Sequence, residues 1–268
     1  HHLFASLGCA TENLSLAARA RGKSGEARFE TSGQGRVRVD LGAAQPQETD
    51  LFAAIPARQC SRVTYDGKAA PADALARLEA AANRYGVEAV FATDEKTTEG
   101  ILNLVVKGNS RQIDDPAFVA ELKDWIRFNP EAALAARDGL YTAASGNPTL
   151  PVWLGSLFFD LFFTKGAEND KYVEQVRSSA GIVVFVAATN DKQGWVNAGR
   201  AYQRFALQAT VDGLKHAFVN QPVEVPELRG ELQALLGIGD RRPNLVVRFG
   251  YGPIMPKSLR RRVGDVIV

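Results

Sequence analysis

The chain has 268 residues, a formal net charge of +2, 46% hydrophobic residues and 23% charged residues. These values are ordinary for a soluble globular protein, and the balanced charge gives no reason to expect nucleic acid or a membrane surface as a partner. Two cysteines and three histidines supply neither a disulfide framework nor a metal site, and every apolar run is shorter than the roughly 20 residues that span a bilayer.

The first 45 residues predict one helix and one hairpin. Residues 3–20 carry apolar or small side chains at helical spacing, and Gly22 ends the pattern. Residues 27–31 and 37–41 alternate in polarity across a Gly-containing turn, which is typical of a hairpin. Because these elements cannot close a core alone, we expect one domain at 1–45 and a second at 46–268.

The second domain predicts helices mixed with strands. We expect helices at residues 73–84, 97–110, 114–128, 195–219 and 226–236, and strands at 88–93, 181–187 and 244–249. The stretch 138–153 predicts a loop. The phenylalanine-rich stretch 157–163 favours a buried helix start, and an aromatic wall or lid over a pocket is the alternative.

Two arginines four residues apart form the first candidate site, in the sequence Arg58-Gln59-Cys60-Ser61-Arg62. If the apolar lead-in before them is helical, both guanidiniums can reach one anion, and their planar forks suit phosphate oxygens. Two solvated arginines near a turn are the alternative. A dyad of Cys60 with His216 is conceivable, but nothing in the sequence places these residues together. His216 lies in the predicted helix 195–219 and favours a core role.

A basic cluster near the C-terminus forms the second candidate site. Four cations lie between residues 257 and 262. The cluster is short and lacks the interleaved aromatic residues of a nucleic-acid surface, so a solvated run of charges is the alternative to an anion site.

Several of these segments resemble the nitroreductase family of FMN-dependent oxidoreductases. Residues 58–67 resemble the family's opening segment, with Gln59 at an arginine position and Cys60 at a serine position. Residues 195–214 resemble its central helix, and residues 10–22 resemble a segment from the middle of a unit. A subgroup fuses two units in one chain, so the resemblance implies that 1–45 is the incomplete tail of a first unit and 46–268 is a second, FMN-binding unit. The family's Pro-Ser-x-x-Asn-x-Gln-Pro signature is absent.

The resemblance implies an α+β fold, a three-layer α-β-α sandwich with a mostly antiparallel sheet. It places FMN against residues from both ends of the unit and assigns no catalytic side chain. Gly146 and Asn147 are implied for the substrate pocket. The implied cofactor-binding residues are Arg58, Gln59, Cys60, Arg62, Asn220, Gln221, Arg260 and Arg261.

The function implied is FMN-dependent reduction of nitro-aromatics, quinones or similar electron-poor compounds with NADH or NADPH. The alternative is a flavin-binding or flavin-sequestering protein whose pocket is covered and which has no turnover. A cofactor-free interaction domain is a third possibility. The expected partners are a small-molecule electron acceptor and a second nitroreductase-like unit, in the same or a separate chain. The compartment stays open, because any export signal would precede residue 1.

Overall fold

A four-stranded sheet lies at the centre of the computed structural model, which describes residues 1–267 and leaves residue 268, the last of the predicted second unit, outside the description. The strand order is β3-β6-β8-β7, and each neighbouring pair is antiparallel. This arrangement confirms the predicted antiparallel sheet. The strands are β3 (Val87–Ala92), β6 (Gly181–Ala187), β7 (Lys215–Phe218) and β8 (Pro243–Gly250).

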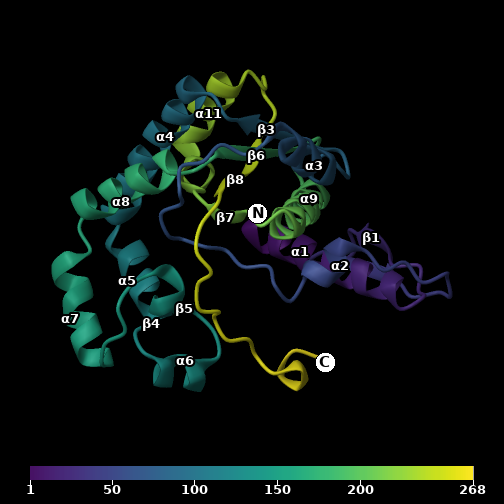
Figure 1. The fold of residues 1–268 in the computed structure, drawn as a ribbon, viewed down its shortest axis with the longest axis horizontal. Coiled ribbons are helices and arrows are strands. Elements are labelled where there is room, and N and C mark those ends of the chain that lie inside the picture. Colours follow the sequence, from purple (N-terminus) through teal and green to yellow (C-terminus); the bar gives the residue numbers. More distant parts are fainter. Residues whose placement is uncertain (268) are drawn as a thin grey trace.

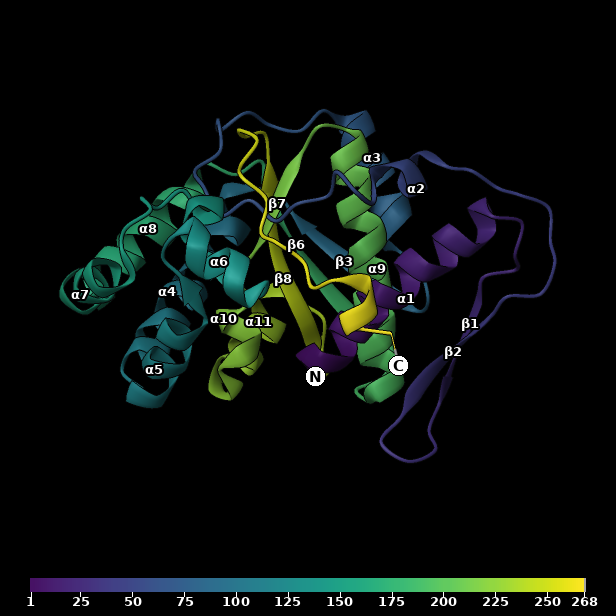
Figure 2. The ribbon, with the colours of Figure 1, turned by 90° about the horizontal axis from the view of Figure 1, so that it is seen from below.

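Helices cover both faces of this sheet, as Figures 1 and 2 show. The first layer contains α1 (His2–Ala20), α3 (Ala72–Ala82) and α9 (Lys192–Val211), with α2 (Asp50–Ala54) packed on α1 and α9. The second layer contains α4 (Glu95–Ile113), α8 (Lys165–Arg177), α10 (Gln221–Glu224) and α11 (Arg229–Leu236).

The side chains of β6 point alternately to the two faces of the sheet, which explains why helices pack on both faces. Val183 and Phe185 point into the first layer, whereas Ile182 and Val184 point into the second. Successive side chains of a strand point to opposite faces, so an uninterrupted apolar strand buries both of its faces. The predicted α-β-α sandwich is confirmed.

The remaining elements lie outside the sandwich. The hairpin of β1 (Glu26–Glu30) and β2 (Arg36–Asp40) projects from the body in Figure 2. A second group lies at the lower left of Figure 1, between α4 and α8 in the chain. It contains α5 (Pro116–Trp125), β4 (Ile126–Arg127), α6 (Pro130–Ala136), β5 (Leu140–Tyr141), the 3-10 helix η1 (Thr142–Ser145) and α7 (Val152–Phe162). Two further 3-10 helices are η2 (Pro226–Leu228) and η3 (Val263–Asp265).

Three predicted boundaries are wrong. The predicted helix 195–219 ends at Val211, because Gly213 adopts a left-handed conformation (φ +75°) and turns the chain into β7. His216 therefore lies on a strand. The helix predicted at 114–128 ends at Trp125, where the chain becomes extended. The predicted loop 138–153 contains β5, η1 and the start of α7.

Helix α1 packs closely along α9. A Cβ atom added to Gly199 would lie 1.9 Å from the Ala5 carbonyl oxygen, so the missing side chain allows the close approach. The buried Glu12 carboxylate accepts hydrogen bonds from Arg200 and Arg204, each at 3.0 Å. A buried charge needs such partners, so this network fixes the register of the two helices.

The buried Arg248 of β8 holds the segment that contains the first arginine motif. Its guanidinium donates to the backbone oxygens of Ser61 (3.3 Å) and Val63 (2.8 Å) and lies 4.1 Å from the centre of the Tyr65 ring. Residues 61–65 are therefore fixed to the central sheet rather than mobile on the surface. Among the described residues, no helix has the length and apolar character needed to cross a bilayer.

Candidate functional site

A cavity of about 520 Å³ lies between the sheet and the outer group of helices. This volume is in the range of small-molecule sites, roughly 300–1,000 Å³. Its apolar lining comes mainly from phenylalanines, and its polar lining comes from the 58–67 segment, η1 and α8. The lining includes Arg62, Phe128, Ser145, Asn147, Phe158, Phe159, Phe162, Phe163, Glu168, Lys171, Tyr172 and Gln175.

Helix α7 supplies the aromatic wall of this cavity. Phe159 and Phe163 stack with their ring centres 4.5 Å apart, and Phe158 and Phe162 lie 5.3 Å apart. Gly155 is buried against Phe128, whereas Phe162 is 63% exposed. The prediction of a buried helix start is wrong, since α7 presents its rings to the cavity and to solvent. The alternative, an aromatic wall, agrees with this arrangement.

Arg58 and Arg62 face different surroundings. Helix α2 ends at Ala54, before Arg58, so the predicted helical face with both guanidiniums does not form. The Arg62 side chain lines the cavity, and its backbone oxygen accepts a 2.6 Å hydrogen bond from Gln175 Nε2. The Arg58 guanidinium instead lies beside Cys60 and Tyr202.

Cys60 and His216, which the sequence could not place together, are in contact. Cys60 Sγ lies 3.8 Å from His216 Nδ1 and 3.5 Å from Tyr202 Oη, and Tyr202 Oη lies 3.4 Å from the same ring nitrogen. Burial alone would raise the pKa of the Cys60 thiol. The His216 ring and the Arg58 guanidinium outweigh burial and lower this pKa to about 6.

Asn220 and Gln221 are not among the residues that line the cavity. Asn220 Oδ1 accepts the Val246 amide at 2.8 Å, so this side chain anchors the end of β7 to β8. Gln221 is buried against Gly108 of α4. Its Oε1 atom is buried and accepts no hydrogen bond from the described residues. Of the two, Gln221 retains a free acceptor.

Gly146 and Asn147 lie at the end of η1. Asn147 lines the cavity. Gly146 has a left-handed backbone (φ +76°), and an added Cβ would lie 2.9 Å from Val63 Cγ1. The close approach brings the end of η1 against the 58–67 segment.

The C-terminal segment returns to the residues around the first arginine motif. Gln59 Nε2 donates to the Pro256 carbonyl at 2.8 Å, and Lys257 Nζ donates to the Pro56 carbonyl. Arg261 pairs with Asp138 at 3.2 Å, and Arg260 is exposed. The structure therefore brings Gln59 and the basic cluster into one region, although Arg261 already has an acidic partner.

Helix α8, which is not among the predicted elements, also contributes to the cavity. Lys171, Tyr172 and Gln175 line the cavity from this helix. Lys171 and Gln175 are four residues apart and so share one helical face, a signal that was available in the sequence.

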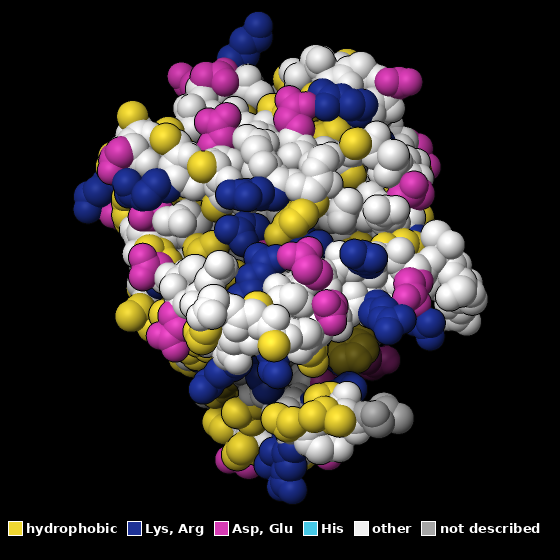
Figure 3. Space-filling view, turned by 90° about the vertical axis from the view of Figure 1, so that its right-hand side faces the viewer, with side chains coloured by type: hydrophobic (Ala, Val, Ile, Leu, Met, Phe, Trp, Pro, Cys, Tyr) yellow, Lys and Arg dark blue, Asp and Glu magenta, His cyan; other side chains and the backbone are white. Residues whose placement is uncertain are grey.

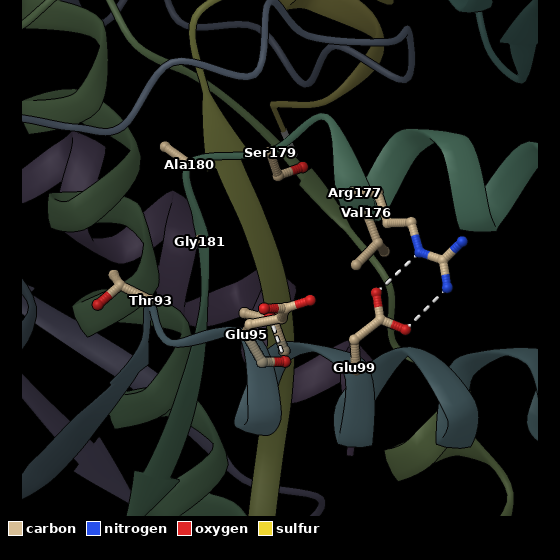
Figure 4. Close-up of a pocket in the computed structure, with 9 residues that line it drawn as sticks. Thr93, Glu95, Glu99, Val176, Arg177, Ser179, Ala180 and Gly181 are labelled. Carbon is tan, nitrogen blue, oxygen red and sulfur yellow. Dashed lines mark hydrogen bonds and ion pairs between the residues drawn. The ribbon is translucent and has the colours of Figure 1, made fainter.

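A second hollow of about 540 Å³ lies at the other end of α8 (Figure 4). Its one cation, Arg177, is held by Glu99 in a two-pronged ion pair with distances of 2.8 and 2.9 Å. Figure 4 shows Glu95 on the same side as Glu99. Because the guanidinium is already neutralised, this hollow offers less for an anionic ligand than the first cavity does.

Comparison with known proteins gives the family context. No family model matches the chain. Two curated proteins of Mycobacterium tuberculosis, "Putative NAD(P)H nitroreductase Rv3131" and "Putative NAD(P)H nitroreductase MT3217", are each 26% identical over 231 residues. Each match covers 83% of this chain and 63% of the relative, so the chain spans less than two thirds of their length.

Solved structures share the fold. The FMN-dependent nitroreductase NfnB of Mycobacterium smegmatis, solved with NADPH, has a TM-score of 0.53 at 12% identity and covers 82% of this chain and 97% of its own. A nitroreductase of Bacteroides fragilis with bound FMN has a TM-score of 0.50 at 17% identity and covers 82% of this chain and 98% of its own. The chain has the nitroreductase fold and is related in sequence to the nitroreductase family.

Proposed function

We propose that this chain is an FMN-dependent oxidoreductase that uses NADH or NADPH to reduce nitro-aromatics, quinones or similar electron-poor compounds. The observation that carries the proposal is the cavity in which a phenylalanine wall and Arg62 line the same space. The relatives named for NAD(P)H nitroreductase activity and the fold neighbours with FMN and NADPH support it.

The residues present fit a flavin nucleotide. A flat ring system needs an apolar, aromatic surface, and a phosphate needs cations. The α7 phenylalanines supply the first, and Arg62 supplies the second. Lys171 also lines the cavity, but its ammonium already lies 3.8 Å from the Glu168 carboxylate. Gln59 and Arg260 lie on segments that meet beside the cavity, and we assign them and Arg261 to the phosphate end. For Arg261, this assignment requires exchange of its Asp138 contact.

The remaining assigned residues divide into ligand contacts and supports. Arg58 and Cys60 face Tyr202, so we assign their backbone, rather than their side chains, to the flavin. Asn220 acts as a support because its carbonyl oxygen is occupied, and Gln221 carries the free acceptor on that side. We assign Gly146 and Asn147 to the substrate end, which is supported by the position of Asn147 in the cavity lining and by the close approach of Gly146 to Val63.

Bound FMN would supply hydride acceptance from the nicotinamide and hydride donation to the second substrate. The chain's part is to bind, orient and exclude water. Arg248 holds the backbone on both sides of Arg62, at Ser61 and Val63, against the sheet. Helix α7 lines the cavity on one side.

The second candidate function is flavin binding without turnover. The exposed rings of α7 favour it, because a wall that closed over the cavity would keep a nicotinamide out. NAD(P)H-dependent loss of the flavin band separates the two functions.

We further propose that residues 1–45 derive from a first unit and that 46–268 pairs with a second nitroreductase-like unit. Exposed apolar side chains on the C-terminal segment, including Ile254 and Val263, support an additional partner. In Figure 3, hydrophobic side chains gather on the lobe at the bottom of the view. A flavin-loaded chain that sediments as a lone monomer would contradict this pairing.

Calorimetric titration of the flavin-free protein with FMN and riboflavin tests the binding site. Arg62→Ala should weaken FMN by about 10- to 150-fold, since a charge-assisted contact contributes roughly 1.5–3 kcal/mol. Arg260→Ala should weaken FMN far more than riboflavin, which lacks the phosphate.

The matched control is Arg38→Ala, which removes an exposed arginine from the projecting hairpin and should leave both affinities unchanged. Equal FMN affinity in wild type and Arg62→Ala would contradict FMN binding in this cavity. Equal effects of Arg260→Ala on FMN and riboflavin would remove the assigned phosphate contact.

A further inference from the structure

The Cys60 cluster has a chemistry that the proposed flavin function does not use. Three elements meet at this thiol: the 58–67 segment, α9 through Tyr202, and β7 through His216. The Ser61 amide also donates to the His216 carbonyl at 2.9 Å, so the backbone fixes the contact as well as the side chains. A thiol held against an imidazole is the arrangement that generates nucleophilic cysteine.

His216 is a buried ring with one free nitrogen. The residue is 1% exposed, and its Nδ1 atom faces both the thiol and the Tyr202 hydroxyl. Its Nε2 atom is buried and makes no hydrogen bond to the described residues. The ring is therefore held by packing and by the Cys60 cluster, rather than by a competing structural hydrogen bond.

Cys9, the other cysteine of the chain, provides an internal comparison. It lies on α1, and its Sγ atom is 3.4 Å from the Gly199 carbonyl oxygen. Burial raises the pKa of the Cys9 thiol to about 12. The pKa of the Cys60 thiol is lowered to about 6 by His216 and Arg58. The two thiols should therefore differ in thiolate content at neutral pH.

We propose that Cys60 is a reactive thiolate site for small hydroperoxides, activated by His216 and Arg58 and flanked by Tyr202. Cys60 is only partly exposed, so the reagent must be small. The Arg58 guanidinium beside the sulfur provides the positive charge that favours both the thiolate and the developing anionic leaving group.

The reaction is a two-electron oxidation of sulfur. The Cys60 thiolate attacks one oxygen of hydrogen peroxide, the S–O bond forms and the O–O bond breaks. The sulfur becomes a sulfenic acid, and hydroxide leaves. The hydroxide takes the proton that the thiol had lost to its surroundings and departs as water. The proposal needs no flavin, and its failure would leave the flavin-binding experiment unaffected.

The groups that set the pH dependence come from every element around the sulfur. They are Arg58 and Tyr65 of the same segment, Cys9 of α1, Tyr202 of α9 and His216 of β7. Arg248 of β8 lies nearby but donates to the neighbouring Ser61 carbonyl. Since the pKa of the thiol is lowered, reactivity should be present above about pH 6 and be lost as the pH falls below this value.

Peptide mapping of the full-length protein treated with hydrogen peroxide and a sulfenic-acid trap tests the assignment. At pH 7 the trap should label Cys60 and leave Cys9 unlabelled. Cys9→Ser should keep the labelling, and Cys60→Ser should abolish it. Equal labelling of the two cysteines, or no labelling of Cys60, would overturn the proposal.

The rate of alkylation by iodoacetamide is then measured against pH in the Cys9→Ser variant, where Cys60 is the only thiol. The pH at which this rate reaches half of its maximum is the midpoint. The midpoint should lie near 6. In wild type at pH 7, Cys60 should react on the order of 100-fold faster than Cys9, after allowing for the lower intrinsic nucleophilicity of a less basic thiolate. A midpoint at the ordinary thiol value of about 8.5 would contradict the proposal.

Variants of the flanking groups test whether the residues around Cys60 cause its low pH midpoint. In the Cys9→Ser background, His216→Gln should move the midpoint toward the ordinary thiol value. If His216→Gln does not fold, Tyr202→Phe carries the test, because it keeps the ring and removes the hydroxyl beside the sulfur. It should raise the midpoint by a smaller amount, and an unchanged midpoint in Tyr202→Phe would contradict the assigned role of the cluster.

Discussion

Single buried charges hold the parts of this molecule in register. Glu12 is fully buried and accepts hydrogen bonds from Arg200, Arg204 and Tyr85, the last at 2.9 Å. Arg248 is fully buried and holds residues 61–65 to β8. The Glu12 contacts join the N-terminal helix to the core, and the Arg248 contacts hold the backbone on both sides of Arg62.

Glu12→Ala should destabilise the protein by about 3–5 kcal/mol, because it leaves two arginines near the interior without their acidic partner. Urea unfolding followed by circular dichroism measures the loss. Glu26→Ala is the control, since Glu26 makes an exposed 3.5 Å ion pair with Arg19, and it should change stability by at most about 1 kcal/mol. Similar losses in the two variants would contradict the role assigned to Glu12.

At the scale of elements, the hydrophobic pattern predicted the bounds of those strands and helices that depend only on residues close together in the sequence. Strand β6 has the predicted bounds, because seven apolar residues in a row fit a strand buried on both faces. The helix predicted at 195–219 was too long, since the apolar spacing continues past Gly213 into β7. Residue spacing does not detect a left-handed turn, so His216 was placed on the wrong element.

The packing of α1 on α9 rests on two glycines. Gly8 and Gly199 leave room for the backbone of the facing helix, and an added Cβ would lie 2.0 Å from the Val196 oxygen or 1.9 Å from the Ala5 oxygen. The sequence showed an amphipathic helix at 3–20, but it did not show which helix would receive it.

Gly199→Ala should therefore cost about 1–3 kcal/mol, because the helices must separate to admit the methyl group. Gly230→Ala is the matched control. Gly230 is also helical, and an added Cβ there meets no atom within 4 Å among the described residues. This change should be neutral or stabilising by up to about 1 kcal/mol, as expected from helix propensity. Thermal unfolding of both variants checks the difference, and a neutral Gly199→Ala would contradict the close-packed interface.

At the scale of the whole molecule, the site depends on contacts between distant parts of the chain. Arg62 and the α7 phenylalanines are far apart in the sequence but line the same cavity. Gln59 and Pro256 are 197 residues apart and are joined by a hydrogen bond. The family resemblance suggested that both ends of the unit would meet, and Gln59 and Pro256 do so. It did not suggest the Cys60–His216 contact, because residues 156 positions apart are joined only by folding.

The outer group of elements from α5 to α7 was the least predictable part. The Gly- and Pro-containing stretch 138–153 reads as a loop, yet β5 pairs with β4 and η1 packs on Val63. These contacts are made with other segments, so local sequence does not specify them. They nevertheless shape the cavity.

The central claim is that the chain binds FMN in this cavity and reduces it with NADH or NADPH. The most direct measurement is the visible absorption spectrum of the FMN-loaded full-length protein under anaerobic conditions, before and after addition of each nicotinamide. The flavin band should be lost with at least one of them and should return when an electron-poor acceptor such as a quinone is added. A flavin band that persists with both nicotinamides would contradict the oxidoreductase and favour flavin binding without turnover.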